Sequence, residues 1–499
     1  MKGAAYQSLR NKVRQFEPST LLKCIAHVSA LRIKDPHGLT RLLAKHLTNP
    51  HVGLPDFVLA ELAKMTLDVE TRPYYRRDKI PTYRDLAYLQ QLYFDVDAEQ
   101  NFEDMDDVEQ FFFRLSSLQF PSQDGVWQLV PRTLLIHKRP VASRTTKAGT
   151  FDTDLRFRQM MGLSLDEYTF LGVSLFALAV AARDGLLHLD HLLSIPLPQY
   201  ERTKVEAFLH VTSTDFDQFR TECKAKCHPQ PGLEIYDYNP LVARPVVRLS
   251  GGQYVLPIPR LLIERVTSGV FYDLAATHGN EFLTYLGHSY QRYVGMLFEG
   301  IEDIQVLPEM EYGSKKQRRL SPDWVIVHRD DAIVVECKTK RLRLGSRLPH
   351  MKDELRADLE KGVATAVTQL STAVADIRNG AVYPQISSAR LFPLVVTLDE
   401  SYFFNTNTVR SLVSEQLAMA GTSAIDYQVA GTREIEYLSA FQNGARMLDI
   451  VSKKYGDPSA HQNDLATLIR DMGGYQKHPL LEKTYKEFLA EMRLGTTLR

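Results

Sequence analysis

The hydrophobic pattern of the chain changes after about residue 240. Before that point, apolar residues recur at spacings of three and four, which indicates amphipathic helices. Pro, Gly, Asn and Asp residues separate these segments. The pattern predicts helices over residues 21–31, 54–65, 83–94, 106–118 and 163–187. Residues 1–240 are therefore expected to form a mainly α-helical amino-terminal domain with a recognition or regulatory role.

Beyond this region, short apolar runs of strand length alternate with helical patterns. A glycine turn within residues 244–257 predicts a hairpin, so residues 241–278 are expected to be a connecting hairpin and helix. An α/β domain is expected over 279–449 and a helical tail over 450–499. The predicted elements of the α/β domain are helices over 280–299 and 355–374 and strands over 304–307, 324–327, 332–335, 391–398 and 425–429.

Two of these strands carry the most informative polar residues. Residues 324–327 and 332–335 flank a polar turn, which predicts a hairpin. Because side chains alternate along a strand, Val334, Glu336 and Lys338 share one face. We expect one face of the hairpin to be core and the other to carry chemistry. Asp323 begins the partner strand, so strand pairing can bring its carboxylate beside Glu336.

Two adjacent carboxylates repel each other and favour a bound cation. Mg²⁺, or Mn²⁺ in its place, takes carboxylate oxygens and keeps several waters, which leaves positions for a phosphate oxygen and an attacking water. Lys338 would add a positive charge that lowers the pKa of this water or stabilises charge at phosphorus. The predicted chemistry is metal-dependent hydrolysis of a phosphodiester bond.

These residues also carry a family resemblance. Pro322-Asp323, then twelve residues, then Glu336-Cys337-Lys338 resembles the core motif of the PD-(D/E)XK nucleases, the restriction-endonuclease-like superfamily. The same three letters recur at residues 222–224, but in a polar stretch that is predicted to be helical. The resemblance covers about residues 280–440 and implies a restriction-endonuclease-like mixed sheet flanked by helices. It also implies an Mg²⁺-dependent endonuclease that acts on nucleic acid, with DNA favoured over RNA.

The resemblance implies a role for each residue of the motif. Asp323 and Glu336 would bind the metal, with the backbone carbonyl of Cys337 as a further ligand. Lys338 would position or activate the water.

Two glutamines are accessory candidates. Related nucleases often place a glutamate on the first helix, and Gln291 stands at that place here. Gln291 would be an outer catalytic member with weaker affinity for the metal, unless Glu281 or Glu299 serves instead. Some family branches use a glutamine on the second helix, where this chain has Gln369. Alternatively, both glutamines are solvated side chains of amphipathic helices.

Charge indicates a nucleic-acid surface around the motif although the whole chain is neutral. Lys plus Arg and Asp plus Glu number 60 each. Between residues 315 and 347, however, ten basic residues stand against four acidic ones. Cations on both sides of the hairpin can hold phosphates without reading sequence. The residues assigned to nucleic-acid binding are Lys315, Lys316, Arg318, Arg319, Lys340, Arg341 and Arg343.

Composition indicates an ordinary globular protein of more than one domain, with 499 residues, 44% of them hydrophobic. The first residues are too polar for a signal peptide, and the longest uncharged apolar stretch, residues 168–182, is too short to span a bilayer. We expect a cytoplasmic protein without a membrane partner. Four cysteines are too few for a disulfide framework. A zinc site at Cys223 and Cys227 is a weaker alternative, because their spacing is not that of a zinc ribbon.

The residues leave several functions open. A nuclease without a recognisable motor or methyltransferase motif favours defence against foreign DNA such as phage DNA, by analogy alone. Cutting both strands needs two sites, which favours a homodimer or a defence-system partner protein. A catalytically silent nucleic-acid-binding module with the same fold is an alternative that Gln291 favours. A helical scaffold or interaction protein with an incidental hairpin is the other.

Overall fold

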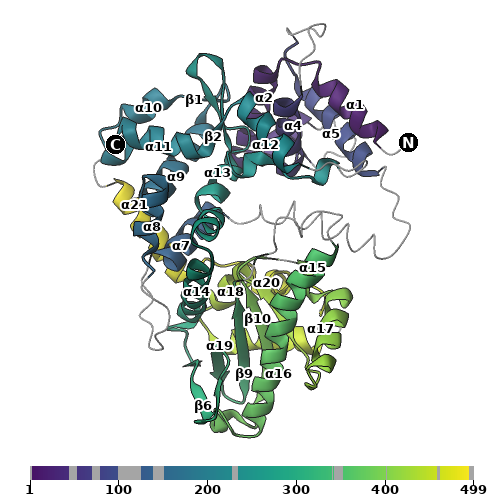
Figure 1. The fold of residues 1–499 in the computed structure, drawn as a ribbon, viewed down its shortest axis with the longest axis vertical. Coiled ribbons are helices and arrows are strands. Elements are labelled where there is room, and N and C mark those ends of the chain that lie inside the picture. Colours follow the sequence, from purple (N-terminus) through teal and green to yellow (C-terminus); the bar gives the residue numbers. More distant parts are fainter. Residues whose placement is uncertain are drawn as a thin grey trace. The chain divides into compact units, whose positions relative to one another are not determined.

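The computed structural model describes residues 3–43, 53–69, 79–98, 125–138, 151–227, 234–339, 341, 352–400, 402–457 and 461–493. The chain divides into two compact units (Figure 1), which are described one at a time. The first unit comprises Met1–Gln110, Asp152–Thr277 and Ala490–Arg499, and the second comprises Phe111–Phe151 and His278–Leu489. The segment 241–278, expected as a connection, thus lies in the first unit except for its last residue. Most of the expected tail lies in the second unit.

The first unit is mainly helical, as the hydrophobic period predicts. Its helices are α1 (Ala4–Val13), α2 (Pro18–Lys34), α3 (Pro36–Leu43), α4 (Asp56–Asp68), α5 (Tyr83–Ala98), α8 (Thr153–Met161), α9 (Leu165–Ala181), α10 (Leu189–Leu193), α11 (Arg202–Thr212), α12 (Phe216–Lys226) and α13 (Pro259–Val266). The helix predicted over 163–187 ends early, at Ala181, because Ala182 has an extended backbone and strand β1 (Leu186–Leu187) follows. The helix predicted over 106–118 lies outside the described residues.

A small sheet completes the first unit, with the strand order β1-β4-β3-β2. β3 (Val246–Arg248) and β4 (Tyr254–Val255) form the predicted hairpin, and Gly251 and Gly252 supply the positive φ values of its turn. β2 (Ser213–Thr214) pairs with β3 in parallel. The motif-like letters at residues 222–224 lie on α12, a helix, as predicted.

The second unit is built on a mixed five-stranded sheet with the order β11-β10-β9-β8-β5. β5, β8 and β9 are antiparallel neighbours, whereas β9, β10 and β11 run parallel. A two-stranded ribbon of β6 and β7 is inserted between β5 and β8. The strands are β5 (Gln305–Pro308), β6 (Glu311–Ser314), β7 (Gln317–Leu320), β8 (Trp324–His328), β9 (Asp331–Lys338), β10 (Arg390–Thr397) and β11 (Gln428–Gly431).

Helices connect and cover these strands. α14 (Val270–Phe298) leads into the unit and breaks at Gly279, whose φ is 53°. α15 (Lys352–Leu359), a π-helical turn (Glu360–Ala364) and α16 (Thr365–Arg378) connect β9 to β10, and α17 (Asn407–Met419) connects β10 to β11. The remaining helices are α7 (Val126–His137), α18 (Thr432–Ser439), α19 (Gly444–Gly456), α20 (Leu465–Gly473) and α21 (Pro479–Arg493).

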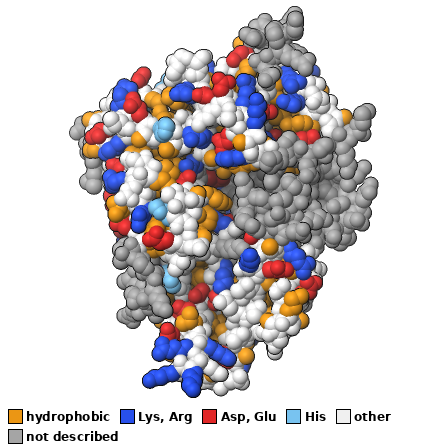
Figure 2. Space-filling view, viewed as in Figure 1, with side chains coloured by type: hydrophobic (Ala, Val, Ile, Leu, Met, Phe, Trp, Pro, Cys, Tyr) orange, Lys and Arg blue, Asp and Glu red, His pale blue; other side chains and the backbone are white. Residues whose placement is uncertain are grey.

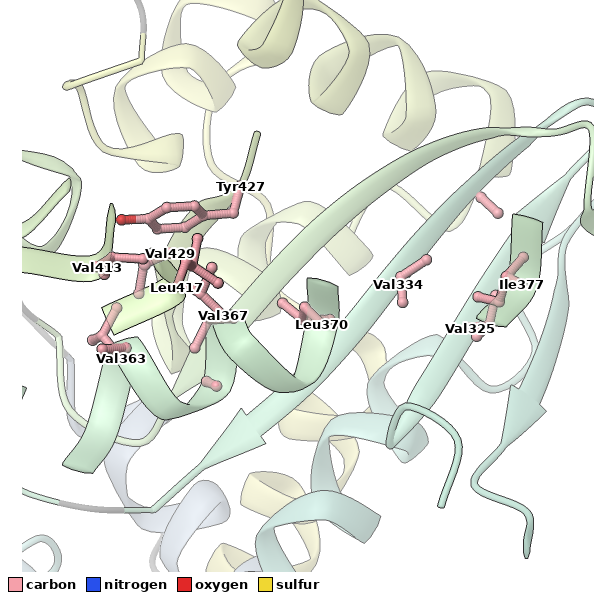
Figure 3. Close-up of a cluster of buried hydrophobic side chains, with 14 of the residues drawn as sticks. Val325, Val334, Val363, Val367, Leu370, Ile377, Val413, Leu417, Tyr427 and Val429 are labelled. Carbon is pink, nitrogen blue, oxygen red and sulfur yellow. The ribbon is translucent and has the colours of Figure 1, made fainter. Parts of the chain in front are cut away.

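The hydrophobic core of this unit lies on the sheet face that α16 and α17 cover (Figure 3). Val325 of β8 and Val334 of β9 pack there with Val367 and Leu370 of α16. Ile333 and Val335, on the opposite face of β9, are also fully buried. The prediction that only one face of the hairpin is core is therefore wrong, because the opposite face is also covered, by α14, whose Gly295 lies against the Trp324 ring.

In the described part of the chain, no single helix is long and apolar enough to cross a membrane. One bent pair, α8 with α9, passes the same test of length and composition.

Candidate active site

The β8–β9 hairpin places the two predicted metal ligands opposite each other. Trp324 pairs with Val335 and Val325 pairs with Val334. One step outward, the same register sets Asp323 beside Glu336, on the face covered by α16. The sequence prediction for this carboxylate pair is therefore in agreement with the pairing of the strands.

A β-bulge at Pro322 shapes the backbone at Asp323. Glu309 N donates to Asp323 O at 3.0 Å on one side of the bulge, and Ser321 N donates to Met310 O at 3.0 Å on the other. The register of β5 with β8 and that of β6 with β7 differ by one residue, and Pro322 is the extra one. Proline suits this place because it has no N–H to leave unpaired. Bulges bend a strand and change the direction of its side chains.

The Asp323 carboxylate takes the place of a strand partner for Cys337. Cys337 N donates to Asp323 Oδ2 at 2.6 Å. On the other side of β9, Leu398 N donates to Lys338 O at 2.9 Å. The N–H and C=O of one strand residue point to the same side, and successive residues alternate. The Cys337 carbonyl therefore faces the Asp323 side, as the predicted ligand set requires.

Burial leaves this carboxylate pair short of positive charge. Glu336 is 9% exposed, and burial raises its pKa. Burial and the neighbouring Glu336 raise the pKa of Asp323 to about 8, although the hydrogen bond from Cys337 lowers it. A bound cation would remove this penalty by supplying the missing charge.

Lys338 is held in the site by two oxygen acceptors. Its Nζ donates to Glu336 Oε1 at 2.6 Å and to Gln369 Oε1 at 2.7 Å. Gln369 lies on α16, so the second-helix glutamine that the sequence singled out does reach the site. An ammonium group has three hydrogens, and these bonds use two of them.

The side chain of Gln291 contacts Glu309, a carboxylate beside the Asp323–Glu336 pair. Its Nε2 lies 3.5 Å from Glu309 Oε2, whereas its backbone carbonyl accepts from Trp324 Nε1 at 2.8 Å. Glu309 contributes to the raised pKa of both Asp323 and Glu336. Sequence reasoning missed Glu309, because it enters the site only through the register of β5 with β8.

The donor set fits a hard divalent cation. Among the described residues, no group of three or more His, Cys, Asp or Glu side chains is arranged to hold a metal ion. Asp323, Glu336 and the Cys337 carbonyl offer oxygen alone, which Mg²⁺ and Mn²⁺ accept together with several waters. Asp323 Oδ1 and Glu336 Oε2 are not used by the two hydrogen bonds that hold these carboxylates.

The predicted nucleic-acid contacts fall into different environments. Lys315 and Lys316 form the exposed turn between β6 and β7. Arg318 pairs with Glu311 at 3.3 Å, and Arg319 pairs with Asp376 at 2.8 Å.

The remaining predicted contacts follow β9. The side chain of Arg341 is only 10% exposed and pairs with Asp399 at 3.1 Å, so the structure does not display it as a surface cation. Lys340 and Arg343 lie outside the described residues.

Comparisons of the chain with protein-family models, with curated proteins and with solved structures found no match.

Proposed function

We propose that this chain is a metal-dependent nuclease that hydrolyses DNA phosphodiester bonds at the ends of β8 and β9. The observation that carries the proposal is the arrangement of Asp323 and Glu336 on paired strands, with Lys338 bonded to Glu336. The mixed sheet with helices on both faces supports a restriction-endonuclease-like fold.

Asp323 and Glu336 would hold the metal ion with the Cys337 carbonyl. Bound Mg²⁺ would supply positive charge to a phosphate oxygen and lower the pKa of a bound water. The two carboxylates are held in place beforehand, one by the Cys337 amide and the other by Lys338. Such preorganisation avoids a rearrangement during the reaction.

Lys338 would act on the substrate through its third hydrogen. With two hydrogens bonded to Glu336 and Gln369, the third can donate to a phosphate oxygen or to the attacking water. Gln369 is neutral, so it orients the ammonium group without cancelling its charge. We assign Lys338 as a catalytic residue and Gln369 as a positioning residue.

The test is cleavage of linear, circular and single-stranded DNA, and of RNA, in Mg²⁺, Mn²⁺ or EDTA. We expect metal-dependent cleavage of DNA that falls at least about 100-fold in Asp323→Asn and in Lys338→Met. Lys224→Met is the matched control, because Lys224 ends the same three letters and lies at an exposed position of α12. Cleavage that persists in EDTA or in Asp323→Asn would overturn the proposal.

A catalytically silent binding module is the second candidate. It is favoured by the lack of a cluster of three metal-ligating side chains among the described residues. This candidate predicts salt-sensitive DNA binding and no cleavage in any metal. The same experiment therefore separates the two functions.

A further inference from the structure

The β6–β7 ribbon is an exposed arm that begins beside the candidate active site. Its base is the Pro322 bulge, directly before Asp323, and each of its strands has four residues. All residues of β7 are exposed, and so are Met310 and Leu320 at the base. Figure 2 shows Lys and Arg side chains gathered at the end of the second unit where Figure 1 labels β6.

The turn of the ribbon carries unpaired positive charge. Ser314 pairs with Gln317, so Lys315 and Lys316 alone form the turn. Both lysines are exposed, and within the described residues neither has an acidic partner. Arg318 adds a cation whose side chain is 66% exposed, although it pairs with Glu311. The tip of the ribbon is thus complementary to a polyanion.

The ribbon is fastened to the helix that also positions Lys338. Tyr312 and Arg319 are cross-strand partners, and both bind the carboxylate of Asp376 on α16. Gln369, which holds Lys338, lies about two turns earlier on the same helix. Asp376 therefore fixes the angle of the ribbon relative to the site, and Arg319 is an anchor of the ribbon.

A glycine determines the shape of the ribbon. Gly313 has a φ of 93°, and a Cβ there would lie 2.5 Å from the Gln317 carbonyl oxygen. Other residues would strain the backbone and collide with the opposite strand. A Gly313→Ala substitution therefore changes the shape of the ribbon while leaving every charge in place.

We propose that the β6–β7 ribbon enters the major groove of duplex DNA and that Lys315 and Lys316 contact its phosphates. The B-form major groove, about 12 Å wide, admits a two-stranded ribbon. The A-form RNA groove is too narrow for side chains to read, and a single strand has no groove.

The length of the ribbon sets where these contacts fall. Lys316 precedes Asp323 by seven positions, which at about 3.3 Å per residue spans at most about 23 Å, because the strand bends at the Pro322 bulge. At about 3.4 Å per base pair, the lysines would contact phosphates no more than about seven base pairs from the scissile bond. The position of that bond rests on the nuclease function proposed above.

The experiment is equilibrium binding in EDTA, where the proposed nuclease cannot cut. Wild-type protein and variants are titrated by fluorescence anisotropy against duplex DNA, single-stranded DNA of the same sequence and duplex RNA. Lys315→Ala/Lys316→Ala is compared with Lys483→Ala/Lys486→Ala, which removes the same charge from exposed positions of α21. Gly313→Ala tests shape without any change of charge.

We expect the wild type to prefer duplex DNA. The tip variant should bind duplex about 10-fold more weakly and lower its salt slope by about two, one for each lost phosphate contact. Gly313→Ala should also lose duplex affinity, whereas the α21 variant should match the wild type. The proposal is overturned if the wild type shows no duplex preference, or if the tip variant weakens single-strand binding equally or weakens nothing.

Cleavage assays with Mg²⁺ keep the two proposals apart. Ribbon-dependent duplex binding without cleavage would remove the nuclease function and keep the ribbon as a DNA-binding arm. If both cleavage and duplex binding were unchanged in the ribbon variants, the nuclease would stand and the arm would be removed.

Discussion

At the residue scale, the chemistry of the site depends on side chains that are held by one another. Asp323, Glu336 and Lys338 could be predicted from sequence, because a strand alternates its side chains and the motif fixes their spacing. Glu309 could not, since its place depends on a pairing between strands whose register no local pattern encodes. The bulge at Pro322 could not be predicted either, because it depends on the same strand pairing.

Gln369 offers a test of positioning at this scale. Gln369→Ala should lower kcat about 10- to 100-fold with little change in KM, because Lys338 loses the acceptor that orients it. Gln369 is exposed, so the protein should keep its stability. Thr372→Ala, one turn further along α16, is the control. The measurements are steady-state kinetics and thermal melts. A wild-type kcat in Gln369→Ala would contradict the assignment of Gln369 as a positioning residue.

A second residue-scale test measures metal binding through thermal stability, so it does not depend on an activity assay. Mg²⁺ should stabilise the wild type by about 2.7 kcal/mol at a concentration 100-fold above its Kd. Asp323→Asn should lose most of this gain, yet melt higher than the wild type in EDTA, because Asn does not have to take up a proton or bury a second negative charge on folding, as Asp323 does. Thermal unfolding with and without EDTA measures both effects. An equal Mg²⁺ shift in Asp323→Asn would rule out Asp323 as a ligand.

At the element scale, α14 packs closely against β8 on the sheet face opposite the candidate site. A Cβ at Gly295 would lie 2.1 Å from the Trp324 ring, and that ring is fixed by its hydrogen bond to the Gln291 carbonyl. Periodicity predicted both elements, but a contact of this kind depends on the packing of particular side chains. Trp324 directly follows Asp323, so the packing of the helix bears on the site.

Gly295→Ala should destabilise the second unit by about 1 to 3 kcal/mol through overpacking. Gly287→Ala on the same helix has no atom within 4 Å of the added Cβ, so it should stabilise by up to about 1 kcal/mol. The two tryptophans, Trp127 and Trp324, both belong to the second unit, so their fluorescence during urea unfolding reports this unit. If the two substitutions changed the free energy of unfolding equally, the close packing of Gly295 against Trp324 would be contradicted.

At the scale of the whole molecule, the second unit includes a segment, residues 111–151, that lies in the sequence between two segments of the first unit. The domain expected over 279–449 excludes α7, yet α7 belongs to this unit. Arg132 of α7 makes a bidentate ion pair with Glu436 of α18 at 2.6 and 2.7 Å, and Tyr293 donates to the same carboxylate. No helix is predicted from the sequence over the residues of α7, and a local pattern does not say which unit a helix joins.

Arg132→Ala should therefore cost about 3 to 5 kcal/mol, because the carboxylate of Glu436, 1% exposed, would stay buried without the positive charge of Arg132. Arg390→Ala breaks another bidentate pair, with Asp331, but Arg390 is 59% exposed and the cost should stay below about 1 kcal/mol. Urea unfolding followed by tryptophan fluorescence compares the two. If Arg132→Ala cost no more than Arg390→Ala, α7 would add little to the folding of this unit. A large difference would mean that the second unit needs α7 for its stability, and that a fragment covering 279–449 alone lacks the cation that pairs with Glu436.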